Sequence, residues 1–110
     1  MHDVLVNFIK GVKDKQHLMD LLSDSLIKIC IRTEKSNALL LVGKGDLILI
    51  DSDDQEMTDV EIQGGEDVIT SVLQGKIKLR EAVKRGNLNV TASFRMTLYL
   101  ETLFILGKSY

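Results

Sequence analysis

The sequence predicts a single domain that combines α-helices with five short β-strands. Apolar residues recur at helical spacing near both ends of the chain, whereas the middle alternates between apolar and polar residues as strands do. The length of 110 residues is enough for one hydrophobic core and too short for two. Because the chain has three Phe, two Tyr and no Trp, aliphatic side chains must form nearly all of that core.

The first quarter of the chain is predicted to be helical and then extended. Apolar residues fall at helical spacing over residues 4–12 and again over 18–22, and Asp3 is placed to cap the first helix. From Leu26 the period changes to two. Ile27, Ile29 and Ile31 point one way, and Lys28, Cys30 and Arg32 point the other. This alternation predicts a half-buried strand.

Residues 38–42 and 47–50 are two apolar runs joined by Gly43-Lys44-Gly45-Asp46, which predicts a β-hairpin. Both runs carry apolar residues on both faces of the expected strands. We therefore expect a helix, another subunit or a ligand to cover the second face. A fourth strand is predicted over 58–63, and it ends at Gly64-Gly65.

The second half of the chain is predicted to return to helices. Residues 66–74 and 79–83 have helical spacing, and Gly75 and Gly86 follow these two segments as C-terminal stops. Residues 87–91 alternate as a fifth strand. A final helix is predicted to begin after Ser93, a favourable N-cap, and to run to Gly107.

The final helix is more apolar than one contact with a sheet requires. Its wide apolar face consists of Met96, Tyr99, Leu100, Leu103, Phe104 and Leu106. A narrower second face consists of Phe94, Leu98 and Ile105, and polar residues that include Glu101 separate the two. The second face fits a partner subunit, an apolar ligand, a membrane, or the ordinary exposure of a few apolar residues.

The net charge of −2 conceals a strong segregation of charge. Residues 46–75 hold nine acidic residues and no Lys or Arg, whereas residues 76–110 hold seven basic residues and two acidic ones. Two interpretations remain open. The two stretches are solvated faces of opposite sign, or the basic run 76–85 meets an anionic lipid surface or an acidic partner.

The sequence does not indicate an enzyme. Gly64-Gly65 lacks the spacing of a dinucleotide-binding loop, and no nucleophile is paired with a base. His2 and His17 lie far from other zinc ligands, and the acidic run Asp51–Glu56 lacks the glycine and the final glutamate of a calcium loop. The aromatic residues are too few for a platform that stacks nucleic-acid bases. We therefore expect no catalytic residue, no metal, no cofactor and no nucleic-acid partner.

The location of the protein is predicted from what the chain lacks. A single cysteine, Cys30, excludes an internal disulfide and fits a reducing compartment. No stretch approaches 18 consecutive apolar residues, and the first residues lack the pattern of a secretory signal. We expect an intracellular, cytoplasmic protein.

The order of motifs between residues 59 and 92 resembles the sterol-carrier-protein-two family. An acidic-aliphatic strand, Asp59-Val60-Glu61-Ile62-Gln63, closes in Gly64; a helix ends in Leu73-Gln74-Gly75-Lys76; and Gly86 precedes the strand Leu88-x-Val90. Each motif alone is weak, but their order and spacing together are moderately specific. The helices and strands predicted outside this window also fit, so the resemblance covers residues 1–110 as one domain.

The resemblance implies an α+β fold, with a mostly antiparallel five-stranded sheet, helices packed on one face, and an apolar tunnel or cavity between them. It also implies non-enzymatic binding or transfer of a sterol, fatty acid, acyl-CoA, phospholipid or quinone-type ligand. An empty cavity of ~300 Å³ would cost about 7 kcal/mol at roughly 24 cal/mol per Å³. Such a cavity should therefore be occupied, collapsed or covered by a mobile element.

Specific residues follow from combining the resemblance with the predicted faces. We expect the lipid cavity to be lined by Ile29, Leu40, Ile62, Val68, Val72, Val83, Leu100, Leu103 and Phe104. Head-group or membrane contacts are expected from Lys76, Lys78, Arg80 and Lys84. The alternative is a protein-interaction module with the same fold and a filled core, which uses an extra apolar face to form a homodimer or to bind a partner.

Overall fold

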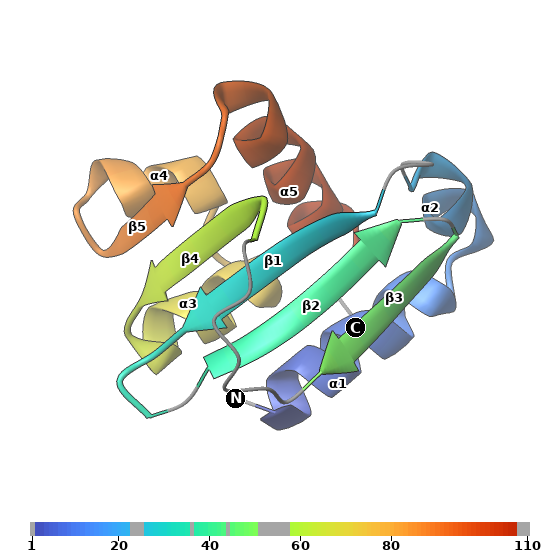
Figure 1. Cartoon of the computed structure of the whole chain (residues 1–110), viewed down its shortest axis with the longest axis horizontal. Coiled ribbons are helices and arrows are strands. Elements are labelled where there is room, and N and C mark those ends of the chain that lie inside the picture. Colours follow the sequence, from blue (N-terminus) through green and yellow to red (C-terminus); the bar gives the residue numbers. More distant parts are fainter. Residues whose placement is uncertain (1, 23–25, 36, 44, 51–57, 108–110) are drawn as a thin grey trace.

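The computed structural model describes residues 2–22, 26–35, 37–43, 45–50 and 58–107 of the chain (Figure 1). Within these ranges, five elements come before residue 55 and five follow it. In order they are α1 (His2–Lys13), α2 (Gln16–Leu21), β1 (Ile27–Arg32), β2 (Asn37–Gly43), β3 (Asp46–Ile50), β4 (Val60–Gly64), α3 (Glu66–Leu73), α4 (Leu79–Lys84), β5 (Leu88–Thr91) and α5 (Phe94–Leu106). The elements predicted from periodicity are therefore present.

The five strands form one sheet in the order β3-β2-β1-β4-β5. Neighbouring strands run antiparallel except for β1 and β4, which run parallel with Ile29 opposite Val60. The chain forms the meander β1-β2-β3, and β4 then joins the free side of β1 rather than the edge strand β3. The sheet is thus mixed, with one parallel pair at its centre.

The helices α1, α3 and α5 lie on the same side of this sheet (Figure 1). Burial alternates along β1, with Ile27, Ile29 and Ile31 buried and the residues between them half-buried. Leu40 of β2 is fully buried opposite Ile29. The hydrophobic core therefore lies between the helices and the inward face of the sheet.

Two helices end where the sequence predicts that they should. Gly75 follows α3 and Gly86 follows α4, with φ angles of 73° and 80°. Side chains other than glycine rarely adopt this left-handed conformation, so a glycine at these positions ends each helix without strain. The chain can then turn sharply into its next segment.

The outward face of β2 and β3 keeps apolar side chains in contact with solvent. Ile48 is 48% exposed and Ile50 is 37% exposed, while Leu39 and Leu41 opposite them are half-buried. The helices cover only the inward face of these strands (Figure 1). Within the residues that the structure describes, no helix covers the outward face of β2 and β3. Its covering by another subunit or a ligand stays a prediction.

Candidate functional site

Helix α5 carries the candidate site, and its start is fixed by a capping interaction. The Ser93 side chain accepts a hydrogen bond from the backbone N–H of Met96 at 3.1 Å. The Thr97 hydroxyl donates to the Ser93 carbonyl at 2.9 Å. The predicted N-cap at Ser93 is confirmed, and it places the first turn of α5 directly after β5.

The far end of α5 packs closely against α1. The rings of Phe8 and Phe104 meet edge to face, with centroids 5.4 Å apart. Gly107, which follows the helix, is buried, and a Cβ atom there would lie 2.6 Å from Cγ2 of Val12. This distance is too short for a van der Waals contact, so the absence of a side chain at Gly107 allows the two helices to approach.

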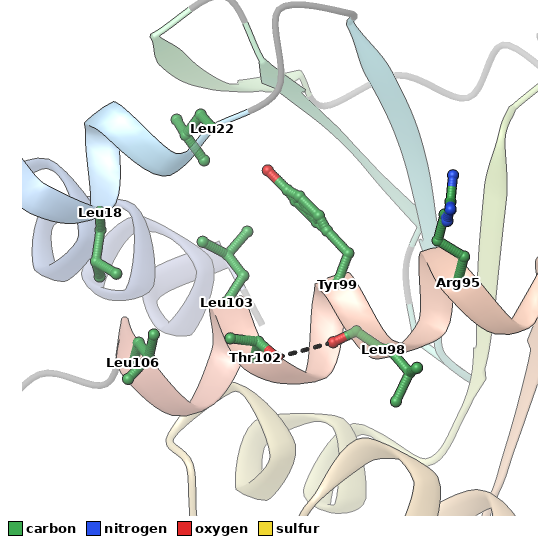
Figure 2. Close-up of a pocket in the computed structure, with 8 residues that line it drawn as sticks. All are labelled: Leu18, Leu22, Arg95, Leu98, Tyr99, Thr102, Leu103 and Leu106. Carbon is green, nitrogen blue, oxygen red and sulfur yellow. Dashed lines mark hydrogen bonds between the residues drawn. The ribbon is translucent and has the colours of Figure 1, made fainter.

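An apolar groove of about 390 Å³ lies between α2 and α5 (Figure 2). Most of its wall is leucine, supplied by both helices. It is lined by Leu18, Leu22, Arg95, Leu98, Tyr99, Thr102, Leu103 and Leu106. Its volume falls within the range of ~300 to 1,000 Å³ that is usual for small-molecule sites.

The groove is polar at one end and apolar at the other. Arg95 stands at one end, and Leu18 and Leu106 stand at the opposite end (Figure 2). The Thr102 hydroxyl donates to the Leu98 carbonyl at 3.0 Å, so its hydrogen is directed to the helix backbone. The arrangement suits an amphipathic molecule, with its charged group at Arg95 and its chain along the leucines.

The two apolar faces predicted for the final helix both contribute to the groove. Leu100, Leu103 and Phe104 of the wide face are buried in the core. Leu98 of the narrow face and Leu106 of the wide face instead line the groove, where Leu106 is 43% exposed. The groove therefore uses residues from both predicted faces.

The space between the helices and the sheet is filled. The enclosed void that the structure describes there measures about 10 Å³, room for roughly one water molecule. It is bordered by Ile31, Ile62, Ile69, Val72, Leu73, Leu79, Leu88 and Phe104.

The nine residues predicted to line a cavity are distributed as follows. Those in the buried core are Ile29, Leu40, Ile62, Val72, Leu100, Leu103 and Phe104. Val68 packs partly buried against the core, and Val83 is 37% exposed on α4. Leu103 is the member of this set that also lines the groove. Contact of these residues with a ligand stays a prediction.

A polar cleft of about 610 Å³ borders α5 on its α4 side. It is lined by Lys78, Arg80, Glu81, Lys84, Arg85 and Glu101. Three of the four residues predicted to contact a head group, namely Lys78, Arg80 and Lys84, therefore lie together. Lys76 is exposed outside this lining.

Glu101 is buried at the base of the cleft and is held by Arg80. The backbone N–H of Arg80 donates to Oε1 of Glu101 at 3.0 Å, and the guanidinium donates to Oε2 at 2.9 and 3.1 Å. These hydrogen bonds hold the pKa of Glu101 below its usual range and raise the pKa of Arg80. The pair fastens the start of α4 to the middle of α5.

Sequence reasoning missed the pairing of Arg80 with Glu101. The sequence pattern places Glu101 among the polar residues that separate the two apolar faces, and in the structure it is only 7% exposed. The two residues are 21 positions apart on different helices, so no local periodicity connects them. Reasoning from sequence likewise missed Leu18 and Leu22 as groove residues, because their pattern indicates only a helix with a buried face.

The described residues contain no group of three His, Cys, Asp or Glu side chains that could hold a metal ion. The run Asp51–Glu56, whose sequence does not match a calcium loop, lies outside them. Among the helices in the described ranges, none has the length and apolar character needed to cross a membrane.

No protein-family model and no curated protein matches the sequence. The structure, in contrast, is similar to solved sterol carrier protein 2 domains. A ubiquinone synthesis protein, UbiJ-SCP2, aligns with 94% of this chain and 90% of its own at 13% identity and a TM-score of 0.71. Sterol carrier protein 2 from Yarrowia lipolytica aligns over 94% and 88% of the two chains at 13% identity and a TM-score of 0.61.

Two further kinds of structure match. Palmitated sterol carrier protein 2-like 2 from Aedes aegypti covers 89% of this chain and 91% of its own, at 12% identity and a TM-score of 0.56. A mutant of the sec-alkylsulfatase PisA1 covers 84% of this chain at 17% identity and a TM-score of 0.66, but the chain spans only 14% of the alkylsulfatase. The chain has the sterol carrier protein 2 fold, which agrees with the resemblance seen in its sequence.

Proposed function

We propose that this protein binds a single-chain amphipathic lipid in the groove between α2 and α5, without changing it chemically. The observation that carries the proposal is the groove itself, which offers about 390 Å³ between two helices and is lined mainly by leucine. The filled core makes this surface groove a better candidate than an internal tunnel.

The lipid chain lies along Leu18, Leu98 and Leu106 in this proposal. Leu98 and Leu106 face one groove from positions two helical turns apart, and Leu18 faces it from α2. Each methylene group removed from water contributes roughly 0.8 kcal/mol, so a long chain, and not a few methylenes, is needed to offset an association cost of about 4 kcal/mol or more. Leu106, which is 43% exposed, would become buried on binding.

The head group lies at Arg95 in this proposal. Arg95 is exposed at the polar end of the groove, where its guanidinium can bind a carboxylate or phosphate through two N–H groups (Figure 2). A fatty acid is the simplest ligand with this chemistry. The palmitated structure from Aedes aegypti supports this choice by analogy of fold.

The proposal is tested by titrating the protein with a fluorescent fatty acid and by extracting the purified protein for mass spectrometry. Leu106→Gln places an amide in the groove and should weaken uptake on the order of tenfold, while the matched change Val83→Gln should leave it unchanged. Leu106 and Val83 are similarly exposed, 43% and 37%, but only Leu106 lines the groove.

Each result of this comparison has a defined meaning. Absence of both bound lipid and uptake in the unmodified protein contradicts lipid binding. A loss caused by Val83→Gln but not by Leu106→Gln contradicts the groove and favours the cavity predicted from sequence, to which Val83 was assigned. Uptake by Arg95→Ala equal to that of the unmodified protein contradicts the placement of the head group.

A second candidate function is self-association through the outward face of β2 and β3. The observation that favours it is the exposure of Ile48 and Ile50 on the edge strand β3. Light scattering on the unmodified protein and on an Ile48→Thr, Ile50→Thr variant tests it, because threonine keeps the preference for strand structure. A monomer in both cases contradicts this candidate.

A further inference from the structure

The surface formed by α4 and the first turns of α5 combines positive charge with an exposed aromatic ring. Between residues 76 and 101 the chain carries six basic and two acidic residues, a formal charge of +4. The basic residues are Lys76, Lys78, Arg80, Lys84, Arg85 and Arg95, and all of them are exposed. This cluster, together with Phe94, is called the basic surface below.

The two acidic residues of this stretch are already paired. Glu81 accepts from Arg85 at 2.8 Å, and Glu101 accepts from Arg80 at 2.9 Å. These two pairs neutralise four of the charged groups. The excess positive charge therefore resides on Lys76, Lys78, Lys84 and Arg95, which offer it to an external anion.

Phe94 projects from this cluster into solvent. It is 68% exposed, the highest fraction among the large apolar side chains that the structure describes. The Arg80 guanidinium carbon lies 6.0 Å from the centre of its ring, at the outer limit of a cation–π contact. An exposed ring beside a guanidinium suits a surface that is anionic outside and apolar just beneath.

We propose that the basic surface docks the protein on an anionic lipid bilayer. The lysines and Arg95 would contact anionic head groups while the Phe94 ring enters the interface between head groups and acyl chains. A protein partner with an acidic surface would satisfy the cations, but it would bury Phe94 only if it offered an apolar pocket at that point, whereas a bilayer has an apolar layer beneath all of its head groups. The ring therefore favours the bilayer.

Local charge outweighs the negative net charge of the molecule in this proposal. At physiological salt the Debye length is about 8 Å, so a bilayer responds to the charges facing it and much less to those on the far side. The chain as a whole carries −2, but the cleft beside α4, lined by four basic and two acidic residues, carries +2. Binding should accordingly weaken as salt is raised.

The docked orientation also brings the groove close to the bilayer. Helix α5 contributes Arg95, Leu98 and Thr102 to the groove on one side and Glu101 to the cleft on the other. Phe94 and Arg95 are adjacent in its first turn. The polar end of the groove therefore lies beside the docking surface.

Cosedimentation with vesicles tests the proposal independently of lipid uptake. The unmodified protein should bind vesicles of phosphatidylcholine mixed with phosphatidylserine, and should not bind phosphatidylcholine alone. Lys78→Gln with Lys84→Gln should weaken binding on the order of 30-fold, from roughly a fivefold contribution of each cation. Phe94→Ser should weaken it on the order of tenfold.

The control variant removes two positive charges, as the first double variant does, but from another part of the molecule. Lys10→Gln with Lys13→Gln removes two lysines from α1, which lies across the molecule from α4 (Figure 1). Equal weakening by the two double variants would overturn the proposal, because net charge alone would then explain binding. Absence of binding to anionic vesicles by the unmodified protein would also overturn it, and would leave the acidic protein partner in its place. Retained fatty-acid uptake by the docking variants is expected and keeps the two proposals separate.

Discussion

The two sides of helix α5 differ in what they contact. On the α4 side, a buried carboxylate and a guanidinium meet in three short hydrogen bonds that join the two helices. On the α2 side, leucines from two helices face one another across an open groove of about 390 Å³. A directional polar contact thus holds one side of the helix in place, while the other side has unfilled apolar space.

The comparison shows how one helix can be both anchored and available to a ligand. The Ser93 cap and the Arg80–Glu101 pair fix its first half, and the packing of Phe104 and Gly107 against α1 fixes its end. A groove that must stay open needs such support, because apolar walls without a ligand tend to collapse. Single substitutions can remove each of these supports.

The largest effect is expected from Arg80→Ala. This change leaves the Glu101 carboxylate, which is 7% exposed, without two of its three hydrogen-bond donors. A charged group buried without its partners costs about 2 to 3 kcal/mol of stability. Urea denaturation measures the change.

The control Arg85→Ala breaks an exposed pair and should cost at most about 0.5 kcal/mol. Similar costs for both variants would contradict the anchoring role of the Arg80–Glu101 pair.

A smaller effect, of about 2 kcal/mol, is expected from Gly107→Ala. The added Cβ would lie 2.6 Å from Val12 and 3.0 Å from Phe8, so the end of α5 must move away from α1. Thermal denaturation measures the loss. Gly65→Ala is the control, because a Cβ at that position meets no atom within 4 Å. Unchanged stability in Gly107→Ala would show that α5 is not held at this end.

Removal of the helix cap should cost about 1 kcal/mol. Ser93→Ala takes away the oxygen that accepts from the Met96 N–H, whereas Ser93→Asp keeps an acceptor and adds favourable charge at the helix start. Hydrogen exchange at Met96 and Thr97 should quicken in the alanine variant alone. Equal exchange in the two variants would contradict the capping role.

The smallest effect on stability is expected from the titration of Glu101, because it changes stability in acid and not near neutral pH. Its pKa is lowered in the folded protein, chiefly by the hydrogen bonds from Arg80. The stability from this group is therefore present above the unfolded-state pKa of about 4.3 and is lost as pH falls through the lower folded value. Acid denaturation should be less steep in Glu101→Gln than in the unmodified protein. An acid-denaturation curve that is equally steep in both proteins would contradict a contribution of Glu101 to the pH dependence of stability.

Much of the fold could be predicted because its signals are local. Alternation identified three strands, and two apolar runs around a glycine turn identified the hairpin. Helical spacing identified the helices, and Ser93, Gly75 and Gly86 marked boundaries between elements. These signals arise from side-chain directions and backbone preferences that act within a few residues. The candidate site could be predicted only in part. Lys78, Arg80 and Lys84 do share a cleft, but the groove combines Leu18 and Leu22 with α5, and no local pattern links these helices.

The sequence by itself determined the elements, the inward face of the alternating strands, the surplus of apolar residues on the last helix and the separation of charge along the chain. Only the tertiary structure decided that β4 pairs parallel with β1, that the core is filled, and that Glu101 is buried against Arg80. The reason is physical. Periodicity reports which face of an element avoids water, but the partner that covers this face depends on how distant segments pack together.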